Sequence, residues 1–137
     1  MTHHTKTKGD IAIPHAMADL AEKGWDVFIP ISEHLPFDIA AYKDGKFVRV
    51  QVKYRSARAG LVEVRFRSNW TDRHGTHTNK ANKADIDVYC VWCPETRECY
   101  YIDPNLFGES VTLRIARPKN NQTKNVKMAH DYKEMPK

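Results

Sequence analysis

Apolar residues lie three or four positions apart near the start of the chain, between about Lys8 and Lys23. This spacing predicts an amphipathic helix, and Gly24 is a residue that commonly ends one. Pro14 would break the interior of a long helix, so we expect the helix to start late or to hold Pro14 in its first turn.

Most of the remaining chain alternates between apolar and polar residues, which is the pattern of half-buried strands. Strands are predicted over 25–31, 37–42, 46–55, 60–67, 85–93, 99–104 and 111–116. The strand over 60–67 is expected to pair beside the strand over 46–55. Residues 68–84 are polar without a clear period, which predicts a long exposed loop. A helical turn is expected after Asp103 and a last helical segment near the C-terminus.

The strand over 46–55 has two unlike faces. Asp44-Gly45, just before it, is a strong signal for a hairpin with the strand over 37–42. Because side chains alternate along a strand, its valines share one face, and the opposite face carries Phe47, Arg49, Gln51 and Lys53. We expect the valine face to be buried in the core and the polar face to line a cleft.

Composition narrows the class of protein. A chain of 137 residues has the common size of one domain, so we expect 1–137 to fold as a single domain. No apolar run approaches the roughly 18 to 20 residues that cross a bilayer, so no membrane contact is expected. Three cysteines cannot all pair within one chain and no apolar leader is present, which favours the cytoplasm.

Cys90 and Cys93 have the spacing of a zinc-binding pair, with His74 and His77 earlier in the chain. Residues three apart on one strand point to opposite faces, so small core or surface residues are the favoured reading, with Cys93 and Cys99 facing each other across a hairpin. A His-Gly-x-His nuclease centre is disfavoured because the surrounding pattern is missing.

Positive charge is concentrated in the middle of the chain. Between Lys43 and Lys83 there are 11 Lys and Arg against three acids, within a chain whose formal charge is +5. Such an excess favours a polyanion such as the phosphates of nucleic acid. The alternative is a solvated basic surface without a specific partner.

Asp38, Gln51 and Lys53 are residue types that together could bind a divalent cation and a substrate phosphate. A carboxylate, an amide oxygen and a neighbouring backbone carbonyl are ligands for Mg²⁺, which keeps several waters and binds substrate phosphates. Lys53 would then orient or activate the attacking water and stabilise charge that grows at phosphorus. The alternative is structural: Asp38 caps a strand end, and Gln51 and Lys53 form a solvent face.

The sequence PFD over 36–38, followed by VQVK over 50–53 and preceded by TKGDIA over 7–12, resembles the PD-(D/E)XK nuclease superfamily. Within it, the chain is most similar to small intron-associated or phage-borne homing endonucleases with Q-x-K in place of (D/E)-x-K. The likeness extends over 8–38, 84–107 and 113–122, and so over most of the chain.

The resemblance implies an α/β (α+β) fold with a mixed central sheet flanked by helices. It also implies hydrolysis of double-stranded DNA with Mg²⁺ (or Mn²⁺), in a homodimer or homotetramer that cuts both strands, in a prokaryotic or phage setting close to the nucleoid. Asp38 takes the place of the metal-binding carboxylate, Gln51 that of the second acid, and Lys53 that of the motif's lysine.

The chain departs from this family on the first helix. Relatives often carry a glutamate just after GDIA, where this sequence has Ile13. Asp10 lies one turn away on the same face of the predicted helix and is the candidate substitute as a metal ligand. Otherwise the site works with fewer carboxylates or has lost activity.

Basic residues around the predicted cleft are the candidates for contacts with DNA phosphates. They are Lys6, Lys8, Arg55, Arg58, Arg65, Arg67, Arg73, Lys80 and Lys83. The strand over 60–67 exposes Glu63, Arg65 and Arg67 on one face, as a groove-reading ribbon would, or as an ordinary charged strand face would. A Holliday-junction resolvase and a DNA-binding module without activity remain alternatives to a homing endonuclease.

Overall fold

The computed structural model describes residues 4–80, 83–116 and 126–137. Within these ranges, the side chains are described for all residues except 4–6, 67–72, 76–80 and 83. The strands and the long helix within this part of the chain are α1 (His4–Glu22), β1 (Asp26–Phe28), β2 (Ile39–Lys43), β3 (Lys46–Tyr54), β4 (Leu61–Arg65), β5 (Arg67–Asp72), β6 (Gly75–Lys80), β7 (Val88–Cys93), β8 (Glu98–Ile102) and β9 (Ser110–Arg114). Short 3₁₀ helices are η1 (Lys83–Asp85), η2 (Pro104–Leu106) and η3 (Ala129–Tyr132).

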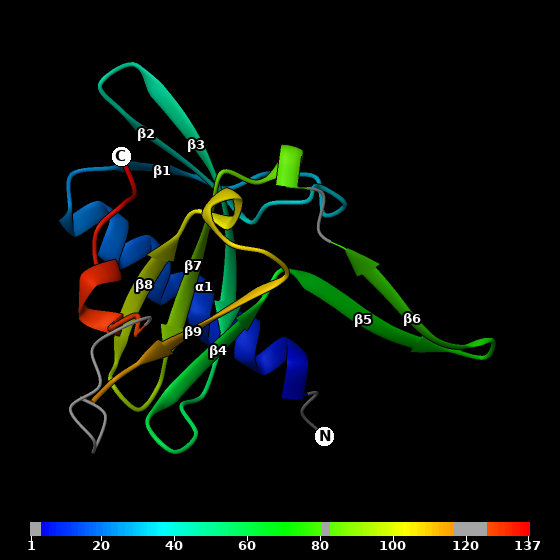
Figure 1. Cartoon of the computed structure of the whole chain (residues 1–137). Helices are drawn as coiled ribbons and strands as arrows, with labels where there is room; N and C mark the ends of the chain where they lie inside the picture. The colour runs from blue at the N-terminus through cyan, green and yellow to red at the C-terminus, as the bar shows by residue number, and fades with distance from the viewer. Residues whose placement is uncertain (1–3, 81–82, 117–125) are drawn as a thin grey trace.

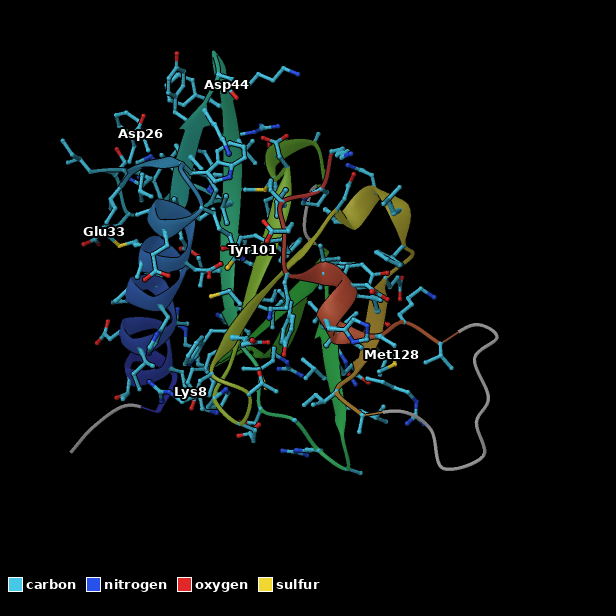
Figure 2. The ribbon with its side chains drawn as sticks, turned by 90° about the vertical axis from the view of Figure 1, so that its left-hand side faces the viewer. Lys8, Asp26, Glu33, Asp44, Tyr101 and Met128 are labelled. Atoms are coloured by element: carbon cyan, nitrogen blue, oxygen red, sulfur yellow. The ribbon has the colours of Figure 1, made fainter. Side chains whose placement is uncertain are left out.

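The central sheet is mixed and has the strand order β1-β2-β3-β7-β8. β3 and β7 are parallel, whereas the other neighbouring pairs in this sheet are antiparallel. α1 covers one face and a two-stranded sheet of β4 and β9 covers the other, while β5 and β6 form a separate ribbon that stands away from the body (Figure 1). The expected mixed sheet is confirmed. Figure 2, turned by 90°, shows α1 on one side of the central sheet, with Lys8 near its N-terminal end.

α1 packs through apolar residues four apart. Ala12, Ala16 and Leu20 are buried against the valine face of β3. Pro14 lies inside the helix, exposed, and so neither of the two expected placements of Pro14 is correct. A proline in a helix interior removes one backbone hydrogen bond, and we attribute its tolerance here to the packing of the buried alanine and leucine face against the sheet.

The hairpin of β2 and β3 is confirmed, and its turn has the backbone that Asp-Gly favours. Asp44 and Gly45 have φ angles of 52° and 82°, the left-handed conformation of both central residues in a type I′ turn. The turn fixes the register, in which Ile39 lies opposite Val50. Val50 and Val52 are buried on the α1 side, as predicted from their alternation.

The strand predicted over 60–67 does not pair beside β3. It forms β4, which pairs antiparallel with β9 and buries Val62 and Val64 against the second face of the central sheet. The predicted loop over 68–84 is also wrong, because most of it forms the β5 and β6 ribbon with Arg67 opposite Lys80. β4 packs through its valine face, while Glu63 and Arg65 are exposed on the other face, as predicted; whether that face reads a DNA groove stays a prediction.

The cysteines lie inside strands and are buried. Cys90 and Cys99 belong to the core on the α1 side, and Cys93 belongs to the core on the other side. The expected pairing of Cys93 with Cys99 across the hairpin is wrong, since Cys99 lies opposite Trp92. Asp103 caps η2, as the expected helical turn requires, and the last helical segment is the short η3. In the part of the chain that the structure describes, no helix is long and apolar enough to span a membrane.

Candidate active site

Asp38 lies just before β2, and its side chain accepts a hydrogen bond from β3 at the point where the backbone pairing of the two strands ends. Its amide donates a hydrogen bond to the carbonyl of Val50 at 2.9 Å. Its carboxylate oxygen Oδ2 accepts a hydrogen bond from the amide of Val52, also at 2.9 Å. These two bonds hold the half-buried carboxylate beside β3, level with Val50 to Val52.

Gln51 and Lys53 lie on the face of β3 opposite its buried valines. Parallel pairing places Gln51 next to Tyr89 and Lys53 next to Val91 on β7. The Lys53 ammonium lies 5.5 Å from the centroid of the Tyr89 ring, a cation–π distance. The Gln51 and Lys53 side chains are half-buried, so the face of β3 that was predicted to line a cleft is partly covered.

Burial acts on both charged groups of this site. It raises the pKa of the Asp38 carboxyl above its ordinary value, against the opposing effects of the Val52 amide and the Lys53 charge. It lowers the pKa of the Lys53 ammonium, as nearby Arg55 does, while Asp38 acts in the opposite direction. Each charged form would therefore gain from a further partner: a cation beside the carboxylate and an anion beside the ammonium.

A groove of about 850 Å³ begins at Lys53. It is lined by Lys8, Lys53, Tyr54, Arg55, Ser56, Arg58, Leu61, Glu63, Arg65 and Thr112, and we call it the basic groove. Glu63 is the single acid among these lining residues, and it is hydrogen-bonded to two arginines of the groove. Its side chain accepts a hydrogen bond from Arg65 at 2.7 Å, and its backbone carbonyl accepts one from Arg55 at 2.8 Å.

The basic groove collects residues far apart in sequence. Of the predicted DNA contacts, Lys8 comes from α1, Arg55 and Arg58 from the segment after β3, and Arg65 from β4. Arg73 lies exposed at the tip of the ribbon. The side chains of Lys6, Arg67, Lys80 and Lys83 lie outside the described ones, and contact with DNA stays a prediction for all nine residues.

A model of the PD-(D/E)XK endonuclease family matches residues 3–135. The chain belongs to the PD-(D/E)XK endonuclease family. It is also similar in structure to a bacterial homing endonuclease, I-Ssp6803I, with a TM-score of 0.75 and 24% sequence identity over 95% of this chain and 88% of that one. At this identity the likeness concerns the fold. No curated protein matches the chain.

For a PD-(D/E)XK endonuclease this chain has few acids at the site. Ile13 is half-buried against the core on the α1 side. Asp10 is exposed on α1. Among the residues whose side chains are described, no three of His, Cys, Asp and Glu come together as a metal-binding group.

The remaining donors nevertheless fit Mg²⁺. Oδ2 of Asp38 is engaged by Val52, and its other oxygen, Oδ1, accepts no hydrogen bond from the described part of the chain. The Gln51 side chain lies on the face of β3 opposite its buried valines, as the Lys53 side chain does. One or two carboxylates together with substrate phosphates and water form a common Mg²⁺ environment, so Asp38 and Gln51 supply a minimal version of it.

Sequence reasoning missed the ion pair of Arg49 with Asp87. The guanidinium donates two hydrogen bonds of 3.0 Å to the two carboxylate oxygens, and the Arg49 amide donates a third at 2.8 Å. The Arg49 guanidinium lowers the pKa of Asp87. This pair holds the start of β7 to β3 next to Gln51, and the run Asp85-Ile86-Asp87 before a buried strand was its available signal.

We expect Lys53→Met to raise the pKa of Asp38 further. The substitution removes the positive charge that favours the carboxylate, while the burial that disfavours it remains. Carbon-13 NMR titration of the Asp38 carboxyl measures the effect, with Lys46→Met at the exposed hairpin turn as the control. An unchanged Asp38 pKa in Lys53→Met would show that the two charges do not interact.

Proposed function

We propose that the protein is a site-specific endonuclease of homing type that hydrolyses phosphodiester bonds in double-stranded DNA with a divalent metal ion. The observation that carries this proposal is that the Asp38 carboxylate is held beside β3, the strand of Gln51 and Lys53, and that Lys53 lines the basic groove. Family membership supports an endonuclease, and the groove supports a polyanionic substrate.

Asp38 and Gln51 are the proposed ligands of the metal, Mg²⁺ or Mn²⁺. Oδ1 of Asp38 and the Gln51 amide oxygen are hard donors of the kind that these ions bind. A bound ion would neutralise charge on the scissile phosphate and make a bound water more acidic. Asp10 is retained as a further proposed ligand, because it is the acid nearest in sequence to the position where Ile13 replaces a glutamate.

Lys53 is the proposed catalytic cation. Its half-buried ammonium is poorly compensated in the free protein, which makes an approaching phosphate oxygen or water a favourable partner. A donor that is already in place as negative charge grows at phosphorus stabilises the transition state more than the ground state. The neighbouring Tyr89 ring, whose centroid lies 5.5 Å from the ammonium, adds a cation–π contact that favours this position.

The basic groove is proposed to hold the DNA backbone. Lys8, Arg55, Arg58 and Arg65 surround it with positive charge, and contacts of this kind fix the position of a duplex without reading its sequence. One chain brings one candidate site, whereas the two strands of DNA run in opposite directions. A homodimer or homotetramer is therefore proposed, because it supplies a second site in the opposite orientation.

Lys53→Ala should lower the rate of duplex cleavage by about 10²- to 10³-fold, since it removes a preorganised donor from the transition state. Binding of the same duplex should weaken by only a few-fold, since one cation among several is lost. Single-turnover cleavage and binding without metal measure the two effects. Lys46→Ala, in the exposed hairpin turn, should match the parent, and parental cleavage by Lys53→Ala would refute the assignment.

Asp10→Asn should raise the Mg²⁺ concentration for half-maximal cleavage by roughly tenfold if Asp10 binds the ion. The physical reason is the loss of one of two carboxylates that attract a divalent cation. Asp44→Asn, which removes an exposed acid of the hairpin turn, is the matched control. Identical titrations for Asp10→Asn and the parent would restrict the ligands to Asp38 and Gln51.

Cleavage of a randomised linear duplex library in Mg²⁺, compared with cleavage of a four-way junction, separates the candidate functions. We expect a recurrent sequence among the cut duplexes, with a constant stagger read from their ends. Preferential cutting of the junction would identify a resolvase of the same fold. Binding that falls steeply with salt, without nicking in Mg²⁺, would identify a DNA-binding module instead.

A further inference from the structure

The β5 and β6 ribbon has no pairing partner among the described strands beyond its own two. It leaves the body directly after β4, which lines the basic groove, and its chain returns through η1 to β7. In Figure 1 it projects from the body on the side where the N-terminal end of α1 lies. A paired but otherwise unsupported ribbon next to a groove for DNA raises the question of what it contacts.

The register of the ribbon sorts its residues into two rows, because residues opposite each other share a face and alternate along each strand. One row, which we call the cationic row, contains Arg67, Asn69, Thr71, Thr76, Thr78 and Lys80. The other contains Ser68, Trp70, Asp72, Gly75, His77 and Asn79. The cationic row has two cations, an amide and three hydroxyl groups without an acid, whereas the other row includes Asp72 and Trp70.

The cationic row follows directly in the chain after residues that line the basic groove. Along β4 the buried positions are even, Val64 among them, and Phe66 after it is buried as well. Glu63 and Arg65, at the odd positions between them, line the groove. Arg67 is the next odd position and begins the cationic row. A bend at Phe66 separates β4 from β5, so the cationic row begins only two residues after the groove-lining Arg65.

A two-stranded ribbon has the width that the major groove of B-form DNA admits. Six residues per strand extend for about 20 Å, which corresponds to roughly six base pairs. Amide groups of the Asn type pair with adenine, Arg and Lys with guanine, and Thr with several bases, so the chemistry of the cationic row matches base edges.

We propose that the β5 and β6 ribbon enters the major groove of the bound duplex and that its cationic row reads the base pairs there. This inference rests on the proposed function, because the basic groove must first hold the DNA. It adds a reader beyond the exposed face of β4, where Glu63 and Arg65 line the basic groove. The chemical class of its target is a run of about six base pairs of B-form DNA.

Asn69 and Asn79 provide a matched test, since they are the same residue on the same ribbon in opposite rows. Duplexes that bind the parent in a chelator are selected from a randomised library and sequenced, so that no cleavage is needed. Asn69→Ala should lose preference at one or two adjacent base pairs and bind the selected duplex about five- to 150-fold more weakly. Asn79→Ala should stay within about twofold of the parent, as a solvent-side substitution would.

Thr78→Val, opposite Asn69, repeats the test with a side chain of nearly the same shape, and thermal melting verifies that each variant folds. Equal effects of the two Asn variants, a larger effect of Asn79→Ala, or a parent without any base preference would overturn the ribbon assignment. Cleavage by the parent with an unchanged preference in Asn69→Ala would overturn this inference and leave the proposed function standing. A parent that binds duplex with the expected preference but does not cut it would overturn the proposed function and leave this inference standing.

Discussion

The hydrogen bond from the Val52 amide to the Asp38 carboxylate is the contact on which the candidate site depends. It places a side-chain oxygen where a strand ladder would place a backbone carbonyl, so the acid is held as firmly as the sheet itself. Oδ2 is engaged in this bond, and Oδ1 accepts no hydrogen bond from the described residues. The same bond opposes the rise in the pKa of Asp38 that burial causes, and it therefore favours the ionised form that a metal ligand needs.

β3 brings the core and the site together because its two faces meet different neighbours. Its valines are covered by α1, which approaches closely through Ala12 and Ala16. Its polar face is only partly covered, since β4 and β9 pack against β7 and β8 and the basic groove opens beside Lys53. Partial cover gives Lys53 a medium in which charges interact more strongly than in water, while leaving access for a large substrate.

Local pattern was sufficient for the part of the fold that holds the site. Alternation in β3 and the Asp44-Gly45 turn fixed which residues face α1 and which lie beside Asp38. The pairing of β4 with β9 was not predictable in this way, because its partners are far apart in the chain and no local period identifies them. The ribbon was missed because both of its rows are mostly polar, so strand alternation leaves no hydrophobic signal. The Arg49 and Asp87 pair needs a parallel neighbour that only the folded sheet provides.

A single carboxylate attracts a divalent cation only weakly. Lys53 near Asp38, and Arg55 near Lys53, add repulsion in the free protein. Under the proposed function the substrate changes this balance, since each DNA phosphate brings negative charge to the same place. The basic groove binds that charge first through residues that need no metal, and the phosphate then completes the set of oxygen donors that Asp38 and Gln51 begin. A site that is poor in acids is therefore compatible with metal-dependent hydrolysis when the metal and the DNA bind together.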